Sequence, residues 1–318
     1  MQSSREGREP LVSVVLPTYN RPKMLQDAVE SVIQQRYSPI ELVVVDDHSD
    51  RPAVDVLESI EFGDTEWKCI RHETNRGANV ARNTGIEAAD GPCIAFIDDD
   101  DRWRERKLER QITALEESHP DVGVVLVGQE YVNDEGERTA IRRPSIVGKA
   151  TEALMRGESA GPFSTILVRA QVIADAGLPD ERFPSWQDRE WLLRLSQCCH
   201  FESVPEPLVV RRIGTHDQIG DDFESKSRVS YPLFLEKHRS LAAEYGVEDV
   251  FRARLASTVA GTALATGNYR AARRYALTAI GSDPGARSAY LYLLLALGGD
   301  LTYRPAVRLK RTITQLTY

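Results

Sequence analysis

The sequence predicts an α/β fold, a mixed but mostly parallel sheet flanked by helices, followed by an α-helical extension. Short apolar runs alternate with helical patterns over about residues 11–103, which is typical of β–α–β units. From about residue 223 no further strand pattern occurs and helical periodicity continues. We therefore expect a polar segment over 1–10, an α/β domain over 11–222 and helices over 223–318.

The composition is that of an ordinary globular protein. The 318 residues are 42% hydrophobic and 28% charged, which fits neither a disordered nor a fibrous chain. A formal net charge of −8, spread along the chain, argues against a nucleic-acid surface. The four cysteines show no paired metal-ligand spacing, so we expect reduced thiols.

No targeting or membrane-spanning segment is evident from the sequence. Residues 1–10 are polar and lack the apolar stretch of a signal peptide. The longest apolar segment, 289–297, is about half the ~18 residues that a spanning helix needs. We expect a cytoplasmic protein, with peripheral contact at the cytoplasmic face of the membrane left open.

Three apolar runs in the first part of the chain predict buried parallel strands. They span residues 11–16, 40–45 and 67–71, and the first two are followed by apolar residues at helical spacing. Pro22 suits the first turn of the helix after the first strand. Residues 75–89 begin as a turn and continue as a helix.

A fourth apolar run, residues 93–97, ends in four carboxylates, Asp98 to Asp101. Four adjacent like charges repel one another, and a divalent cation with oxygen ligands, Mg²⁺ or Mn²⁺, would compensate them. A solvated acidic turn is the alternative. Because parallel strands end at one edge of a sheet, the polar clusters at 18–20 and 46–47 would lie beside these acids. Three such clusters together favour a site for a cation and a phosphate.

The later part of the α/β region is less regular. We expect a helix over 103–118, strands over 122–127, 166–168 and 204–211, and a hairpin-like loop near 133–136. Ser185 is expected to cap a helix whose apolar face includes Trp191.

The helical extension contains one recognisable unit. Small residues at regular spacing and a Gly-Asn-Tyr turn over residues 256–284 resemble one tetratricopeptide-type hairpin. Free-standing arrays need about three copies. We therefore expect a helical tail that packs on the main domain or binds a partner.

Six short motifs follow the order found in one enzyme family. They are Val-Ser-Val-Val-Leu-Pro-Thr-Tyr-Asn at 12–20, Val-Val-Asp-Asp-His-Ser at 44–49, Asn-Arg-Gly with a second Asn at 75–83, the acids at 98–101, Trp-Gln-Asp at 186–188 and Arg-Ile-Gly-Thr-His at 212–216. One motif alone is weak evidence, but six in order cover roughly two thirds of the chain. Residues 12–218 thus resemble an inverting, non-processive family 2 glycosyltransferase with the GT-A fold.

The resemblance implies a nucleotide-binding half over about 11–102 and an acceptor half over about 103–222. Pro17, Thr18 and Asn20 would line the nucleotide site after the first strand. Asp46, or less favourably Asp47, would accept a hydrogen bond from the N3–H of a uracil-type base, an acceptor matched to a donor. The other carboxylate would only cap a helix. Arg76 or Asn79 would border the base.

The acidic run corresponds to the metal motif of the family. Asp98 would face the ribose and Asp100 the cation, with Asp99 between them at a position that is often small and polar. Because four acids are consecutive, the register stays open by one residue. His216 would be a further ligand or a diphosphate contact; a loop histidine without a role is the alternative.

The catalytic base implied by the resemblance is Asp188, which would take the proton of the acceptor hydroxyl. The residue before the base is often acidic in the family, whereas here it is Gln187. Glu190 is the alternative base, or else an ion-pair partner of Arg194.

Three further side chains are expected on the acceptor side. Trp186 would stack on the acceptor sugar or simply pack, and Phe163 and Ser164 would face the acceptor. For Phe163 a place in the core is the alternative.

The expected function is transfer of a sugar from a nucleotide-diphosphate sugar, preferably a UDP-sugar, to a hydroxyl of a glycan or lipid-linked acceptor. A sugar nucleotidyltransferase is one alternative, but no Gly-rich loop with a basic end follows the first strand. A non-catalytic protein that binds nucleotide sugars, or a partner through its helical tail, is the other. The Gln-X-X-Arg-Trp motif of processive members is absent.

Overall fold

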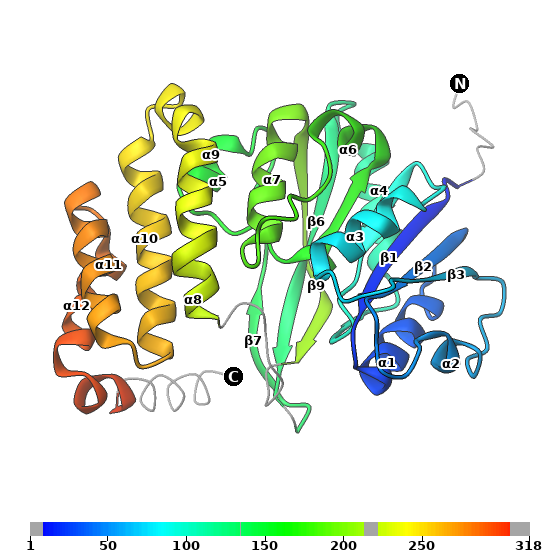
Figure 1. The fold of residues 1–318 in the computed structure, drawn as a ribbon. Helices are drawn as coiled ribbons and strands as arrows, with labels where there is room; N and C mark the ends of the chain where they lie inside the picture. The colour runs from blue at the N-terminus through cyan, green and yellow to red at the C-terminus, as the bar shows by residue number, and fades with distance from the viewer. Residues whose placement is uncertain (1–8, 134, 213–221, 306–318) are drawn as a thin grey trace.

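The computed structural model describes residues 9–133, 135–212 and 222–305. A nine-stranded sheet lies at the centre, and a group of helices extends from one side of it (Figure 1). The strands are β1 (Val12–Thr18), β2 (Ile40–Asp46), β3 (Glu66–Arg71), β4 (Cys93–Phe96), β5 (Asp101–Trp103), β6 (Val122–Val132), β7 (Arg138–Arg142), β8 (Ile166–Arg169) and β9 (His200–Arg212).

The helices follow the strands in alternation and then alone. They are α1 (Pro22–Ile33), α2 (Val54–Leu57), α3 (Ala78–Glu87), α4 (Lys107–Glu117), α5 (Thr151–Met155), the 3-10 turn η1 (Phe163–Thr165), α6 (Ala170–Ala176), α7 (Gln187–Cys198), α8 (Phe223–Ser225), the π-helical turn η3 (Lys226–Ser230), α9 (Tyr231–Glu244), α10 (Glu248–Ala265), α11 (Tyr269–Ser282) and α12 (Arg287–Gly298). Within the three described ranges, none of the helices has both the length and the apolar composition needed to cross a bilayer.

The strand order is β3-β2-β1-β4-β8-β6-β9-β5, with β7 paired to β6. Strands β1 to β4 are parallel to one another, and β6 is parallel to β9; the other pairings are antiparallel. The predicted mixed, mostly parallel sheet with flanking helices is confirmed, and so is the helical region after residue 222.

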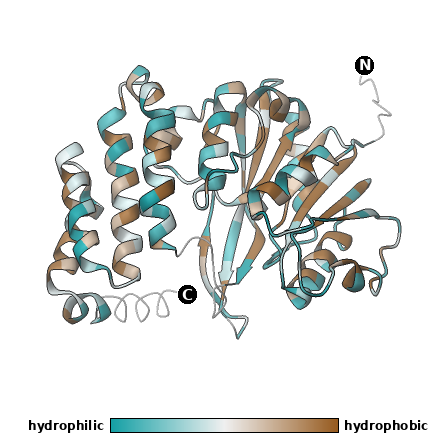
Figure 2. Cartoon of the chain, in the orientation of Figure 1, coloured by the Kyte–Doolittle hydropathy of each residue, from teal (hydrophilic) through white to brown (hydrophobic). Residues whose placement is uncertain are grey.

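Alternate residues of β1 are buried on opposite faces of the sheet. Val12 and Val14 belong to a hydrophobic cluster that includes apolar residues of α1, whereas Val15 belongs to a second cluster with Ile86 of α3. A strand buried on both faces explains the continuous apolar run in the sequence, visible as brown strands in Figure 2. Helix α3 approaches so closely that a Cβ at Gly85 would lie 2.4 Å from Val15 Cγ1, which requires glycine there.

Two elements differ from the prediction. We expected a helix from residue 103, but β5 occupies residues 101–103 and pairs with β9, so α4 begins only at Lys107. Ser185 was expected to cap α7. The cap position is instead occupied by Trp186, in a left-handed conformation with φ 63°, and its side chain makes no capping hydrogen bond.

The helical extension packs on the α/β region through a shared core. Phe234 of α9 and Phe251 of α10 lie in the same hydrophobic cluster as Trp191 of α7. The hairpin predicted for this region is present as α10 and α11, and the Asn268 side chain accepts a hydrogen bond from the Ala271 amide at the start of α11. The tail is therefore part of the scaffold that carries α7.

Candidate active site

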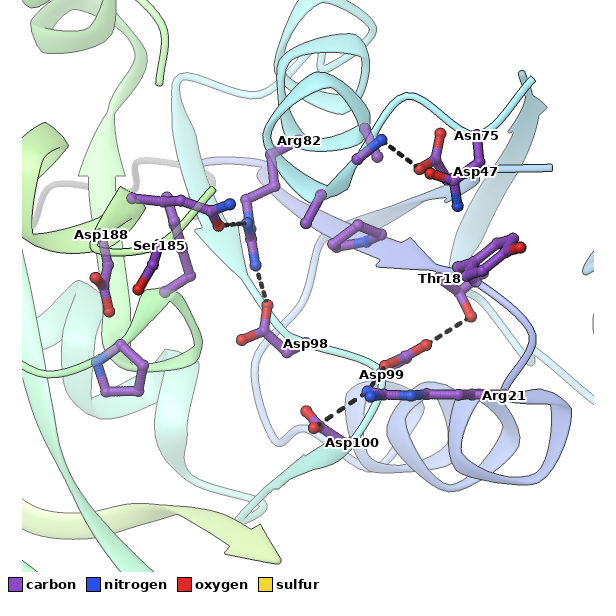
Figure 3. A pocket seen from close by; sticks show the side chains of 18 of the residues that line it. Thr18, Arg21, Asp47, Asn75, Arg82, Asp98, Asp99, Asp100, Ser185 and Asp188 are labelled. Atoms are coloured by element: carbon purple, nitrogen blue, oxygen red, sulfur yellow. Dashed lines mark hydrogen bonds and ion pairs between the residues drawn. The ribbon is translucent and has the colours of Figure 1, made fainter. Parts of the chain in front are cut away.

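A cavity of about 530 Å³ lies at the carboxyl ends of β1, β2 and β4. Its walls include five carboxylates and four cationic side chains, a near balance that leaves room for a charged ligand with a counter-ion. The lining residues are Pro17, Thr18, Tyr19, Arg21, Asp47, Asn75, Gly77, Ala78, Ala81, Arg82, Asp98, Asp99, Asp100, Pro162, Phe163, Ser185, Trp186, Gln187, Asp188, Arg211 and Lys226. Figure 3 shows Asp47, Asn75 and Thr18 on one side of this cavity, Asp188 and Ser185 on the other, and the acidic run between them.

The acidic run turns the chain from β4 into β5, and its side chains have different partners. Asp98 and Asp100 are partly exposed, whereas Asp99 and Asp101 are buried. Asp99 accepts hydrogen bonds from Thr18 Oγ1 at 2.8 Å and Arg21 Nη1 at 3.0 Å. Burial raises the pKa of Asp99 to about 6, against the opposing effect of Arg21. Asp99 thus ties the end of β1 to the end of β4.

Asp101 is held from behind the cavity. Its carboxylate accepts a hydrogen bond from Ser164 Oγ at 2.6 Å and lies 3.3 Å from Arg211 Nε. The same Ser164 hydroxyl accepts a hydrogen bond from the Asp98 amide at 3.0 Å. Ser164 is fully buried and does not line the cavity. We expected it on the acceptor side; it is instead a support for the acidic run.

The chemistry of this run suits a hard divalent cation. One carboxylate oxygen from each of Asp98, Asp100 and Asp101 lies within 4.8 Å of the others, and Mg²⁺ and Mn²⁺ prefer oxygen ligands of this kind. Of the three, Asp98 and Asp100 line the cavity. The other metal candidate, His216, lies outside the described residues.

Arg82 of α3 is a site residue that the sequence analysis missed. It is 4% exposed, and its guanidinium group lies 4.1 Å from the centre of the Phe163 ring. Nη2 donates to Asp98 Oδ1 at 2.6 Å and Nη1 donates to Gln187 Oε1 at 3.0 Å. Arg82 therefore connects the acidic run to the residue before Asp188. It lies three residues after Asn79 on one helix face, which helical spacing could have indicated.

Asp188 lies in the first turn of α7 and lines the cavity. Its carboxylate accepts a hydrogen bond from the Arg189 amide at 2.7 Å. Burial raises the pKa of Asp188, and the nearby Arg82 and Arg211 oppose that shift. A carboxylate with a raised pKa, placed across the cavity from the nucleotide-side residues, has the properties of a general base.

Of the two candidates for the base contact, Asp47 lines the cavity and Asp46, the preferred one, does not. Asp46 is 0% exposed and accepts hydrogen bonds from the Ser49 and Ala53 amides and from Arg71, so it caps the turn after β2 and faces no ligand. Asp47 lines the cavity. Its oxygens accept from the Arg76 amide at 2.9 Å and the Gly77 amide at 2.7 Å.

Three other nucleotide-side candidates are not brought into the cavity. The Asn79 side chain donates to the Asp180 carbonyl at 2.8 Å and so anchors the loop before α7. The Asn20 side chain accepts from the Asp50 amide at 2.7 Å, joining the loops after β1 and β2. Arg76 is exposed and is not among the lining residues, although its amide holds Asp47. Pro17, Thr18 and Asp99 do line the cavity.

The two aromatic acceptor-side candidates both line the cavity and both pack. Phe163 is 2% exposed and contacts Phe96 and Trp191, with ring centres 5.4 and 5.6 Å away. Trp186 is partly exposed and meets Phe234 of α9 edge-on, with centroids 5.9 Å apart. Its left-handed backbone places it in a strained conformation beside Asp188.

Glu190 does not face the cavity. It is 0% exposed and accepts hydrogen bonds from Arg194 Nε at 2.9 Å and from His238 of α9, and it pairs with Lys237 at 2.7 Å. Burial opposes ionisation, but the hydrogen bonds from His238, Arg194 and Lys237 and the positive charge of Arg194 lower the pKa of Glu190 to about 2. A buried carboxylate that stays ionised at such a low pH holds α7 to the tail and is no candidate for the base.

Four further lining residues were not singled out from the sequence. Tyr19 and Arg21 lie in or just after the motif at 12–20, whereas Arg211 lies at the end of β9 and Lys226 at the start of the helical extension. Only the tertiary structure brings the last two to the cavity.

The sequence model described as Glycosyl transferase family 2 matches residues 13–168. An uncharacterized glycosyltransferase of Haemophilus influenzae is 30% identical over 208 residues, which cover 62% of this chain and 67% of that protein. The chain belongs to glycosyl transferase family 2.

One further curated relative and one solved structure are similar to this chain. The Escherichia coli protein named UDP-Glc:alpha-D-GlcNAc-diphosphoundecaprenol beta-1,3-glucosyltransferase WfgD is 36% identical over 140 residues, 44% of this chain and 50% of that protein. The solved structure of mannosyltransferase PcManGT from Pyrobaculum calidifontis with GDP-Man and Mn²⁺ is 18% identical, covers 97% of this chain and 85% of its own, and gives a TM-score of 0.58. That likeness shows the GT-A fold. The chain spans half or less of the length of several curated relatives that it matches.

Proposed function

We propose that the protein is a metal-dependent, inverting, non-processive glycosyltransferase. It would move a sugar from a nucleotide-diphosphate sugar, preferably a UDP-sugar, to an acceptor hydroxyl in glycan, glycolipid or glycoprotein assembly. One observation carries the proposal: the acids Asp98 and Asp100 lie in one cavity between Asp47 and Thr18 on one side and Asp188 on the other. Such an arrangement provides neighbouring positions for the nucleotide base, the diphosphate and the reacting sugar, in that order across the cavity.

Asp47 is the residue that we assign to the base of the nucleotide. A carboxylate has about four lone-pair sites, and three are occupied by the Arg76 and Gly77 amides and by His72 Nδ1 at 2.7 Å. One site on Oδ2 is left for an imide N–H of the ligand. The amides also fix the carboxylate in place, and its remaining acceptor site favours a base that presents a donor.

Asp98 and Asp100 would hold the divalent cation, Mn²⁺ or Mg²⁺. A bound cation would neutralise the charge that develops on the leaving nucleoside diphosphate. Arg21 and Arg82, which pair with Asp100 at 3.2 Å and with Asp98 at 2.6 Å, lie close enough to share that task. Their hydrogen bonds also restrain the two carboxylates before a ligand binds.

Asp188 would accept the proton of the acceptor hydroxyl as the oxygen attacks the anomeric carbon. In an inverting transfer the attack comes from the face opposite the leaving group. The position of Asp188 across the cavity from Asp47 and Thr18 supports this role (Figure 3).

A donor screen tests the proposal. The full chain is incubated with UDP-, GDP- and TDP-sugars in Mn²⁺, Mg²⁺ or EDTA, and free nucleoside diphosphate is measured. We expect release from UDP-sugars only with a divalent cation, and little release by Asp188→Asn. Release of pyrophosphate would instead support a nucleotidyltransferase. Binding of every donor without any turnover would support a non-catalytic protein.

The proposal also includes the cellular location and the domain boundaries. The Escherichia coli relative is named for a lipid-diphosphate-linked acceptor, so we propose a cytoplasmic enzyme that acts at the membrane face. We also keep the division into an α/β domain over 11–222 and an extension over 223–318 as a proposal. A fractionation of cells that express the tagged chain would test the location.

A further inference from the structure

A second cavity, of about 750 Å³, lies where the helical extension meets the α/β region. Its walls come from β7, from Gly157 in the loop after α5, from α7, and from α10 and α12. Three of the lining residues are arginines, Arg142, Arg189 and Arg254, and none of the described residues that line the cavity is an aspartate or a glutamate. Hydroxyl groups of Ser257, Thr258 and Thr262 on α10 complete the polar wall.

The three arginines lack ion-pair partners of their own. None of them lies within ion-pair distance of a carboxylate in the described part of the chain, whereas most arginines of the α/β region are paired there. Arg189 contacts aromatic faces instead, with its guanidinium carbon 5.7 Å from the Trp186 ring centre and 5.8 Å from that of Phe234. Arg142 lies 5.7 Å above the Tyr131 ring.

Two of the three positive charges, those of Arg189 and Arg254, are close enough to affect one another. Burial lowers the pKa of Arg189 to about 10, Asp188 opposes that shift, and Arg254 adds to it. Guanidinium groups that repel one another in a shared cavity are unfavourable unless an anion compensates them. The Arg254 stem also packs against Gly157, with its Cγ and Cδ 3.1 Å from the position a Cβ would take, so the fold directs this side chain to the cavity.

The second cavity adjoins the active site at two points. Arg189 follows Asp188 directly, and Trp186, which contacts Arg189, lines the active-site cavity. Lys226 also lines the active-site cavity and donates to Thr262 Oγ1 at 2.9 Å, a hydroxyl of the second cavity. An acceptor whose hydroxyl lies at Asp188 could therefore reach the arginines with a group a short distance along the molecule.

We propose that this cavity binds a phosphate or diphosphate group of the acceptor. Phosphate oxygens accept several hydrogen bonds from guanidinium forks at once, which matches the three arginines. Of the α10 hydroxyls, those of Thr258 and Thr262 already donate to helix carbonyls, whereas Ser257 Oγ is buried and has no hydrogen-bond partner among the described residues. The inference rests on the proposed function, since it assigns the substrate class of the same active site. The phosphate could belong to a lipid diphosphate or to a soluble phosphorylated glycan.

The first experiment measures binding of inorganic pyrophosphate to the full chain by calorimetry, in EDTA and with saturating UDP. The variants are Arg142→Gln, Arg254→Gln and the double variant; Arg189 is left intact because it adjoins Asp188. The control is Arg270→Gln, an exposed arginine of α11 that does not line the cavity. We expect about tenfold weaker binding for each cavity arginine removed and no change in the control.

Donor hydrolysis separates the two proposals. The double variant should hydrolyse the donor within about twofold of the wild-type rate, since neither arginine lines the active-site cavity. If the double variant binds pyrophosphate as the wild type does, the phosphate site is wrong while the glycosyltransferase proposal stands. If the wild type hydrolyses no donor, the proposed function itself fails. Tighter binding of glucuronate than of pyrophosphate would also overturn the phosphate assignment.

Two competitors distinguish the sources of the phosphate. Geranyl diphosphate carries the same diphosphate group on a lipid chain. If it displaces pyrophosphate more strongly than an equal concentration of unlabelled pyrophosphate does, a lipid-linked acceptor is indicated. Stronger displacement by glycerol phosphate would indicate a soluble or polymeric one. Both results support a phosphate site, provided the double variant abolishes the competition; competition that persists in the double variant contradicts it.

Discussion

Arg82 donates from Nη2 to Asp98 Oδ1 over 2.6 Å, and the arginine side of this ion pair is buried, with Arg82 only 4% exposed. The other guanidinium nitrogen, Nη1, holds Gln187, the residue before the proposed base. One side chain thus fixes the distance between the metal-side acids and the start of α7. The family pattern often has an acid where Gln187 stands; here a neutral amide accepts the arginine hydrogen bond.

Arg82→Lys should lower kcat by roughly 10–100-fold, the equivalent of one charge-assisted hydrogen bond lost. A lysine keeps the charge, but its single ammonium group cannot reproduce the planar fork that binds Asp98 and Gln187 together. The measurement is donor turnover with saturating metal, alongside the melting temperature. Arg51→Lys, an exposed arginine 3.7 Å from Asp55, is the matched control. An unchanged kcat in Arg82→Lys would show that the bridge does not position the base.

Asp188→Asn should lower kcat by roughly 10²–10⁴ while nucleotide binding is retained, because the amide cannot take a proton. Glu190→Gln provides the comparison two residues away. It leaves Arg194, Lys237 and His238 around a neutral group, so we expect a loss of stability of about 3 kcal/mol or more. The folded fraction of that variant should still turn over donor. Stopped turnover in a well-folded Glu190→Gln, with normal turnover in Asp188→Asn, would reverse the assignment.

The elements that follow local rules could be predicted from sequence. The strands β1, β2 and β4 are buried on both faces, so their residues form continuous apolar runs. The acidic run is also recognisable from the sequence, because four like charges directly after a strand need a compensating charge. Strand β5 was missed because it has only three residues and exists through pairing with β9, more than one hundred residues later.

The same distinction, between local patterns and contacts with distant segments, applies to the site residues. Pro17, Thr18 and Asp188 belong to local motifs and do line the cavity. The ion pair of Glu190 with Arg194, one of the two alternatives expected, is present. The support that Ser164 gives to Asp101 and the contact of Glu190 with His238 were not expected, because these partners come from distant segments. Local sequence cannot tell a carboxylate that faces a ligand from one that a later helix neutralises.

The rate should fall on the acid side at a higher pH than an ordinary aspartate would give. Burial raises the pKa of Asp188 above 3.8, and the base acts only when it is ionised. As the pH drops through this raised pKa, the proton stays on Asp188 and kcat declines; above it kcat reaches a plateau. Turnover at saturating donor between about pH 4 and pH 8 measures this limb. Nucleotide binding over the same range is the control, since Asp99 and Asp101 also titrate.

Asp100→Ala should weaken nucleotide binding in Mn²⁺ by roughly tenfold or more and leave metal-free binding nearly unchanged. The variant removes one of the two proposed metal ligands, Asp98 and Asp100, that line the cavity, and Arg21 keeps Asp99 as a partner at 3.0 Å, so the β1–β4 connection persists. Titration of UDP in Mn²⁺ and in EDTA gives both values. Equal loss under both conditions would point to a structural effect of the substitution rather than to a metal ligand.

Asp46→Asn and Asp47→Asn should separate stability from nucleotide recognition at neighbouring positions. Asp46 is fully buried and accepts from two amides and from Arg71, so its amide variant should lose about 1–3 kcal/mol in urea unfolding. Its Kd for UDP should change little in the folded protein. Asp47→Asn replaces an acceptor with a group that can present a donor to the base, and we expect roughly tenfold weaker UDP binding. If Asp46→Asn alone weakens UDP binding at unchanged stability, the original preference for Asp46 as the base contact is restored.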